Sequence, residues 1–157
     1  MLLSEAGEVA GGWPPRETLE SLLELNELSL GLLAEQAAAR GPQPSLLLRQ
    51  FAELWRVMDC AARRRAAACP YLLVDAGFAD PQRWRHAAPP GVGDGAYPGY
   101  ASFFSVPGAT QLARLVFTFA WHLAISQHAA ARLLLGMSAP CAQLISQYSV
   151  REIHALA

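Results

Sequence analysis

The chain has 157 residues, of which 53% are hydrophobic, and a formal net charge of −1. This length is enough for one compact domain, and the apolar fraction excludes a disordered chain. The near-zero charge provides no chain-wide basic field that would attract nucleic acid or an anionic membrane. Alanine and leucine dominate the apolar residues, whereas valine and isoleucine are scarce, so the composition predicts an all-α fold.

Residues 1–15 end in a Gly-Gly-Trp-Pro-Pro cluster that breaks helices, so we expect a loose N-terminal arm. A first helix is predicted over 16–40, because leucines recur there at helical spacing and a Gly-Pro pair follows. A second helix is predicted over 45–69, where Pro70 ends the apolar pattern. The short connection between the two favours an antiparallel helix pair.

The middle of the chain is less regular. Residues 70–88 complete a predicted N-terminal helical part, 16–88, and include Asp80-Pro81, a pair typical of a helix start with proline in the first turn. Residues 89–108 are rich in glycine and proline and are predicted to connect this part to a C-terminal helical part, 109–157. We expect the two helical parts to form one compact domain.

The C-terminal part has a repeated pattern of helix, turn and cap. Gly136 fits the left-handed position after a helix, and Ser138 fits the N-cap of the next one. Ser149 and Glu152 have the spacing of a capping box, in which the two residues bond the free amides of the first turn. The predicted helices span 109–126, 129–135, 138–147 and 149–156. Together with the N-terminal helices they predict a helical bundle of five to seven helices.

Charge is distributed unevenly along the chain. Through Glu35 there are seven glutamates and one arginine, whereas the remainder has eleven arginines and six acidic residues. The densest basic cluster is Arg63, Arg64 and Arg65, near the end of the second predicted helix. Such charges stabilise a helix C-terminus through the helix dipole, and they also suit a phosphate or an acidic partner. Both interpretations stay open.

The segment from Ala129 to Gln147 has the order of helix, glycine turn and capped helix that is typical of a helix-turn-helix. In such a unit the second helix enters the DNA major groove. The candidate contact residues have polar or basic side chains and are Arg132, Ser138, Gln143, Gln147 and Arg151. Simple helical packing is the alternative, and burial of Gln143, Gln147 and Arg151 against another helix would exclude the DNA interpretation.

The C-terminal residues also resemble a known family. The resemblance covers 121–157 and is carried by Leu135-Gly136-Met137, the turn 149–152 and the ending 153–157, together with Leu123 and Ala131. This segment resembles the FlhD family, bacterial transcriptional activators of flagellar genes that act as subunits of a complex with FlhC. The resemblance implies an all-helical dimer that contributes to DNA recognition and binds a partner subunit.

Other residue types do not assemble into a recognisable catalytic, metal or nucleotide site. The three cysteines are an odd number without metal-type spacing, and the four histidines are scattered. The glycine-rich stretch 91–95 lacks the Gly-Lys-Ser/Thr ending of a phosphate loop. We therefore expect no metal, no cofactor and no enzymatic activity.

These features predict a regulatory protein of the flagellar-activator type that binds DNA, a protein partner or both through 129–157. The alternative is a protein–protein interaction module without DNA contact, which uses the acidic first helix or the 63–65 cluster. A homodimer is expected, because the helix predicted over 109–126 is apolar enough to bury two faces. We expect a cytoplasmic protein with no membrane contact, since no signal-peptide pattern opens the chain and polar residues interrupt its longest apolar run, 112–135.

Overall fold

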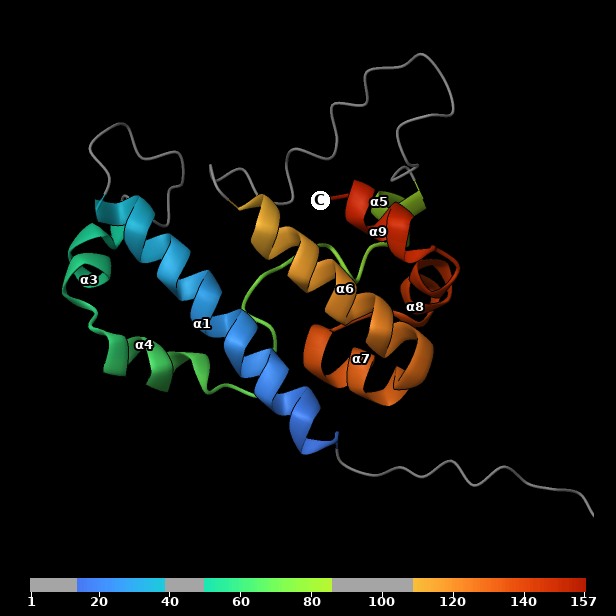
Figure 1. Cartoon of the computed structure of the whole chain (residues 1–157), viewed down its shortest axis with the longest axis horizontal. Coiled ribbons are helices and arrows are strands. Elements are labelled where there is room, and N and C mark those ends of the chain that lie inside the picture. Colours follow the sequence, from blue (N-terminus) through green and yellow to red (C-terminus); the bar gives the residue numbers. More distant parts are fainter. Residues whose placement is uncertain (1–13, 39–49, 86–108) are drawn as a thin grey trace, which may run out of the picture.

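The computed structural model describes residues 14–38, 50–85 and 109–157 (Figure 1). These residues form α-helices joined by turns and contain no β-strand, which confirms the all-α prediction. Within the described ranges there are eight helices, α1 and α3–α9, more than the expected five to seven. Most of the predicted arm, 1–15, and all of the predicted connecting loop, 89–108, lie outside the described residues.

Helix α1 (Arg16–Ala38) is the longest of the described helices and borders two cores. Its N-terminal half contributes Leu22 and Leu25 to the main core, which it shares with α6. Its C-terminal half contributes Leu30 and Ala37 to a smaller core with α3 and α4. The broad leucine stripe of the sequence therefore serves two packing partners that lie on different sides of one helix (Figure 1).

The second predicted helix is divided in the structure into α3 (Ala52–Val57) and α4 (Cys60–Ala67), and its residues 45–49 lie outside the described ranges. A single helix over the whole segment is therefore wrong. Asp59 causes the break, because its backbone is extended and its Oδ1 accepts a hydrogen bond of 2.7 Å from the N–H of Ala62. This is the N-cap geometry that aspartate favours.

An irregular strap, residues 68–80, leads from α4 to the main core (Figure 1). The N–H of Leu72 donates to the carbonyl of Leu134 at 2.7 Å, and the carbonyl of Phe78 accepts from Ser138 at 3.1 Å. The strap ends at α5 (Pro81–Arg85), where Asp80 accepts a hydrogen bond from the N–H of Gln82 at 2.9 Å. This confirms the predicted helix start at Asp80-Pro81.

The C-terminal helices follow the predicted pattern closely. They are α6 (Thr110–Ser126), α7 (His128–Leu135), α8 (Ala139–Ser146) and α9 (Val150–Ala155). Gly136 ends α7 with φ at +61°, Ser138 caps α8, and Ser149 with Glu152 forms the capping box of α9. These three predictions are confirmed.

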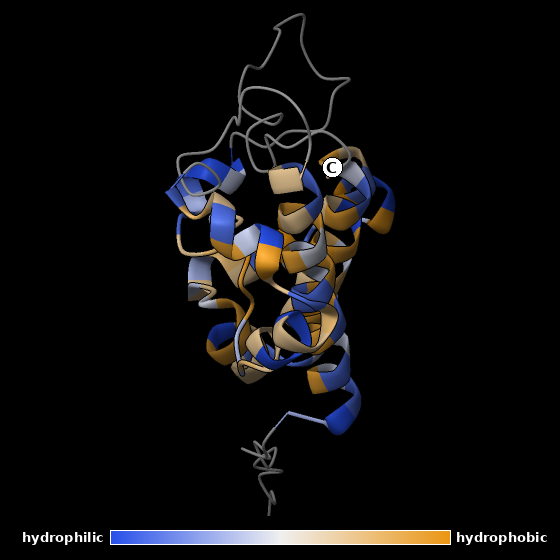
Figure 2. Ribbon diagram, turned by 90° about the vertical axis from the view of Figure 1, so that its left-hand side faces the viewer, coloured by the Kyte–Doolittle hydropathy of each residue, from blue (hydrophilic) through white to orange (hydrophobic). Residues whose placement is uncertain are grey.

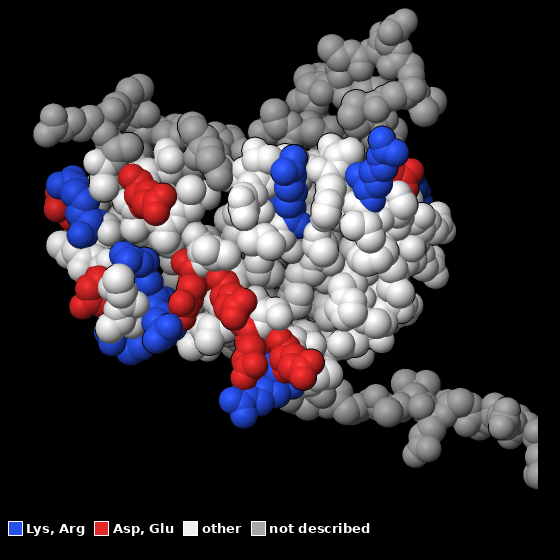
Figure 3. Space-filling view, in the orientation of Figure 1, with Lys and Arg blue, Asp and Glu red and all other residues white. Residues whose placement is uncertain are grey.

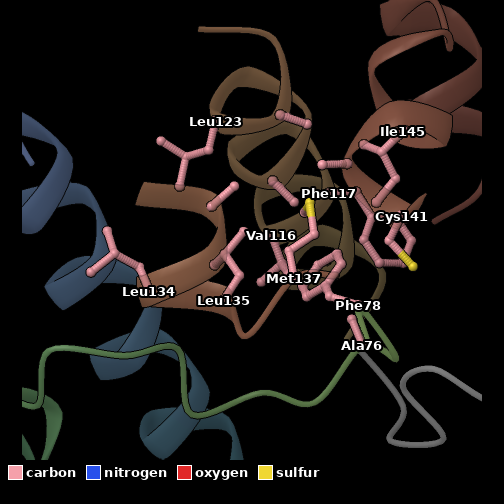
Figure 4. Close-up of a cluster of buried hydrophobic side chains, with 14 of the residues drawn as sticks. Ala76, Phe78, Val116, Phe117, Leu123, Leu134, Leu135, Met137, Cys141 and Ile145 are labelled. Atoms are coloured by element: carbon pink, nitrogen blue, oxygen red, sulfur yellow. The ribbon is translucent and has the colours of Figure 1, made fainter. Parts of the chain in front are cut away.

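Helix α6 runs through the centre of this group and packs against α7, α8, α9 and α1. Phe117 is fully buried, and its ring meets that of Trp84 edge to face with ring centres 5.3 Å apart. Figure 4 shows Phe117 and Val116 from α6 facing Met137 and Phe78. Hydrophobic residues gather between the helices, while hydrophilic ones lie along the outer turns (Figure 2).

No helix in the described ranges combines the length and apolarity that crossing a membrane requires.

Candidate functional site

The basic cluster predicted at 63–65 contributes to packing around α4. Arg63 is half-buried and donates to the carbonyl of Met58 at 2.8 Å and to the sulfur of Cys60 at 3.1 Å. Arg64 forms an ion pair of 3.0 Å with Glu27 of α1, and Arg65 is exposed. Arg63 is thus engaged within α4 and the turn before it, whereas Arg64 and Arg65 stay exposed on the surface of α4.

The residues predicted at the helix-turn-helix-like segment are mostly exposed. Gln143 and Gln147 lie one turn apart on the exposed side of α8, while Arg132 and Arg151 are exposed on α7 and α9. Ser138 is different, since its Oγ accepts from the N–H of Cys141 at 3.3 Å and is used as a cap. The exposed candidate residues are thus two amides and two arginines, and α8 itself carries no basic residue.

A groove between α1 and α6 has a cavity volume of about 680 Å³. Its apolar floor includes two leucines that remain in solvent, Leu28 at 51% exposure and Leu115 at 42%. Leu32 and Leu112 are less exposed and continue the same floor. The full lining is Glu24, Glu27, Leu28, Gly31, Leu32, Glu35, Arg63, Gln111, Leu112 and Leu115.

Carboxylates line the α1 side of this groove. Glu24 and Glu35 lie four and seven residues from Leu28 and so share its face of α1, and Glu27 lies three residues from Glu24 and also lines the groove. Figure 3 shows acidic side chains gathered over the middle of the molecule, where Figure 1 places α1. Arg63 is the one basic residue in the described lining. The groove therefore combines an apolar floor with a negatively charged rim.

Gly31 lies in the middle of α1 and lines the groove. A Cβ atom built at this position would have no other atom within 4 Å, so the space beside it is open. The packing of the described residues therefore does not require a glycine there. Glycine is less favourable than alanine inside a helix, because it loses more backbone freedom on folding.

The titratable groups with shifted pKa values serve structural roles. Burial raises the pKa of the Cys141 thiol and that of the Tyr148 phenol, whose O–H donates to the carbonyl of Trp84 at 2.9 Å. Hydrogen bonds from Ser149 lower the pKa of Glu152, which is partly exposed. In the described ranges no group of three or more His, Cys, Asp or Glu side chains is placed to hold a metal ion.

The groove was not among the sites predicted from the sequence. Leu28 belongs to the leucine stripe of the first predicted helix, and Leu115 belongs to the apolar pattern of the helix predicted over 109–126. The sequence contains one indication of such a site: the apolar residues of each of these two helices cover a wider arc than one buried face requires. That signal does not say which leucines stay exposed, because exposure depends on how α1 and α6 cross.

Comparisons with protein-family models, with curated proteins and with solved structures gave no match. Function is therefore inferred from two surfaces of this chain. One is the groove between α1 and α6, and the other is the exposed part of α7–α9 to which the candidate residues Arg132, Gln143, Gln147 and Arg151 belong.

Proposed function

We propose that this protein is a non-catalytic regulatory subunit of the cytoplasm that acts by binding a protein partner in the groove between α1 and α6. The observation that carries the proposal is the apolar floor of the groove, where Leu28 and Leu115 are about half exposed beside open space. Exposed apolar surface gathered in a hollow and bordered by polar residues is typical of protein-interaction sites. The three cysteines are free thiols, which agrees with a reducing compartment.

The charge of the groove favours a protein over a nucleic acid. Glu24, Glu27 and Glu35 border it, and carboxylates repel the phosphates of DNA or RNA. An apolar floor also has little to offer a phosphate backbone, because phosphate contacts come from arginine, lysine and hydrogen-bond donors. The groove thus supports the interaction-module interpretation of the acidic first helix.

Site-specific cross-linking in the cells that produce the protein tests this proposal. A photoreactive amino acid would replace Leu28 in the groove or, as a control, Leu54 on α3, which is exposed to the same degree at 50%. We expect protease-sensitive adducts of defined mass from position 28 and none from position 54. Adducts that nuclease removes, equal adducts from both positions, or none from position 28 would contradict the proposal.

DNA contact through α7–α9 is the second candidate function. It is supported by the exposure of Gln143 and Gln147 on α8 and by the resemblance of 121–157 to the FlhD family. Gly136 ends α7 and Ser138 caps α8, which is the local order expected for a helix-turn-helix. Of the candidate residues in this segment, only Arg132 and Arg151 are positively charged. Tight binding to DNA would therefore need further basic residues from a partner subunit.

The homodimer also remains a proposal, and it is supported by the surface of α6. Helix α6 buries seven residues within the chain and leaves Ile125 exposed at 47% outside the groove. Sedimentation of the wild-type protein and of Ile125→Ser tests it. A concentration-dependent dimer that the substitution weakens is expected, and a monomer at all concentrations would contradict it.

A further inference from the structure

Building on the proposed function, we propose that the partner segment in the α1–α6 groove is a basic amphipathic helix. Its apolar side would pack on Leu28, Leu32 and Leu115, and its arginine or lysine residues would face the glutamates of α1. Three independent features carry this proposal: the charge of the rim, the spacing of the glutamates along α1, and the open space at Gly31.

Two of the three glutamates on the rim have no ion-pair partner in the part of the chain that the structure describes. Within the described residues no ion pair involves Glu24 or Glu35, whereas Glu27 pairs with Arg64 at 3.0 Å. Arg63 lines the groove, but its guanidinium donates to the carbonyl of Met58 and the sulfur of Cys60, on its own side of the groove. A partner with basic side chains would therefore complement Glu24 and Glu35.

The spacing of the glutamates fits a helical partner. Glu24 and Glu35 are eleven residues apart on one face of α1, a span of about 16 Å at a rise of 1.5 Å per residue. An antiparallel or parallel partner helix of about three turns covers the same span. Leucine or isoleucine at every third or fourth position of that helix would follow the apolar floor, as amphipathic helices do in hydrophobic grooves.

The open position at Gly31 fits close approach of a second backbone. Helix axes pack about 8–10 Å apart, and the shorter distances require small residues at the crossing point. Gly31 lies between Glu24 and Glu35, where a partner helix would cross or run beside α1. Since no described residue contacts a Cβ at this position, a larger side chain there would extend into the groove without a clash inside the chain.

A displayed library of helical peptides with randomised surface positions provides the probe. The full-length protein would be used for selection, followed by affinity measurements on the enriched peptides. We expect enriched peptides to combine an apolar face with arginine or lysine beside it. Peptides that are mainly neutral or acidic, or a failure to enrich any helical peptide, would overturn the basic-helix proposal.

Three variants locate the binding site. Gly31→Leu fills the groove and is expected to weaken peptide binding at least about tenfold. Ala61→Leu adds a leucine to the exposed side of α4, outside the groove lining, and is expected to leave affinity unchanged within about twofold. Glu24→Gln combined with Glu35→Gln is expected to weaken binding about two- to fivefold for each glutamate and to reduce its salt dependence.

The outcomes separate this inference from the function on which it rests. If neutral peptides bind the wild type and no longer bind Gly31→Leu, the proposal of a basic partner helix is wrong. The proposal that the groove binds a protein partner would still stand. Equal binding to Gly31→Leu and Ala61→Leu would overturn the groove as the binding site. A wild-type dimer that Gly31→Leu converts to a monomer would assign the groove to a second copy. If the purified Gly31→Leu protein melts at a lower temperature than the wild type, the groove is occupied by a segment of this chain. Occupation by a second copy or by a segment of this chain would each overturn the proposal.

Discussion

The side-chain amide of Asn26 accepts a hydrogen bond of 2.9 Å from the backbone N–H of Leu73. The same amide donates to the carbonyls of Ala67 at 3.2 Å and Tyr71 at 2.9 Å. Asn26 is completely buried on α1, so this one side chain joins α1 to the end of α4 and to the strap that leads into the main core. It thereby holds α1 in the position from which it forms one wall of the groove.

Replacing this amide is expected to destabilise the fold. Asn26→Leu would leave the N–H of Leu73 and the carbonyl of Ala67 without this partner, while the carbonyl of Tyr71 keeps the Cys69 thiol as a donor. The cost is about 1–3 kcal/mol for each group left unpaired that water does not reach. We expect a loss of about 2–4 kcal/mol in the free energy of unfolding, measured by urea denaturation.

Ser29→Ala is the matched control for this substitution. Ser29 is also buried on α1, but its hydroxyl donates only to the carbonyl of Leu25, one turn earlier, at 2.7 Å. We expect a change below about 1 kcal/mol, because the carbonyl of Leu25 keeps its place in the helix. Equal losses from the two substitutions would contradict the bridging role of Asn26.

The two glycines Gly31 and Gly136 are predicted to respond oppositely to alanine. Gly31→Ala is expected to raise the free energy of unfolding by about 1 kcal/mol, since the position is helical and open. Gly136→Ala is expected to lower it by about 1–2 kcal/mol, because φ there is +61° although no atom crowds the position. Thermal unfolding of both variants checks the contrast, and a change of the same sign in both would refute it.

The capping box of α9 predicts a loss of stability in acid. The Glu152 carboxylate accepts hydrogen bonds from the N–H and the hydroxyl of Ser149, both at 2.7 Å, and these bonds hold its pKa below the usual value. Because the folded-state pKa is the lower one, this contribution is fully present above the unfolded-state pKa and is lost as pH falls through the folded-state pKa.

Glu152→Gln is therefore expected to remove this part of the acid sensitivity. Its free energy of unfolding should fall less than that of the wild type as the pH is lowered through the carboxyl range. Denaturant unfolding at a series of pH values measures the difference. Parallel pH profiles for the two proteins would show that the carboxylate of Glu152 does not contribute as described.

Binding to generic duplex DNA is expected to be weak and to disappear at moderate salt. Each phosphate contact contributes about 0.9 to the slope of log affinity against log salt, so Arg132 and Arg151 together account for a slope near 2. Fluorescence anisotropy at low and moderate salt measures this slope, with Arg132→Ser combined with Arg151→Ser as the test variant. Tight binding at moderate salt, unchanged in that variant, would contradict this description of the α7–α9 face.

Local chemistry made the C-terminal turns predictable from the sequence. Gly136, Ser138 and the pair Ser149–Glu152 act through backbone groups within five residues, so their identity and spacing were sufficient. Asp59 was missed even though it is also a local cap, because the apolar spacing around it continues at helical period. A helix break inside a periodic pattern is therefore the weak point of this kind of prediction.

The groove itself could not be predicted in this way. Its two walls come from α1 and α6, and Leu28 and Leu115 are far apart in the chain. Their exposure depends on the angle between the helices, which long-range contacts such as those of Asn26 determine. For the same reason the sequence did not reveal that Arg64 of the predicted basic cluster pairs with Glu27 of α1.

The affinity of the protein partner recovered by cross-linking at Leu28 tests the central claim most directly. It would be measured by calorimetry for the wild type, Gly31→Leu and Ala61→Leu. The α1–α6 groove predicts that Gly31→Leu alone loses at least about tenfold in affinity, while neither substitution lowers the melting temperature. Wild-type affinity in Gly31→Leu would contradict it, because a filled groove cannot hold the partner.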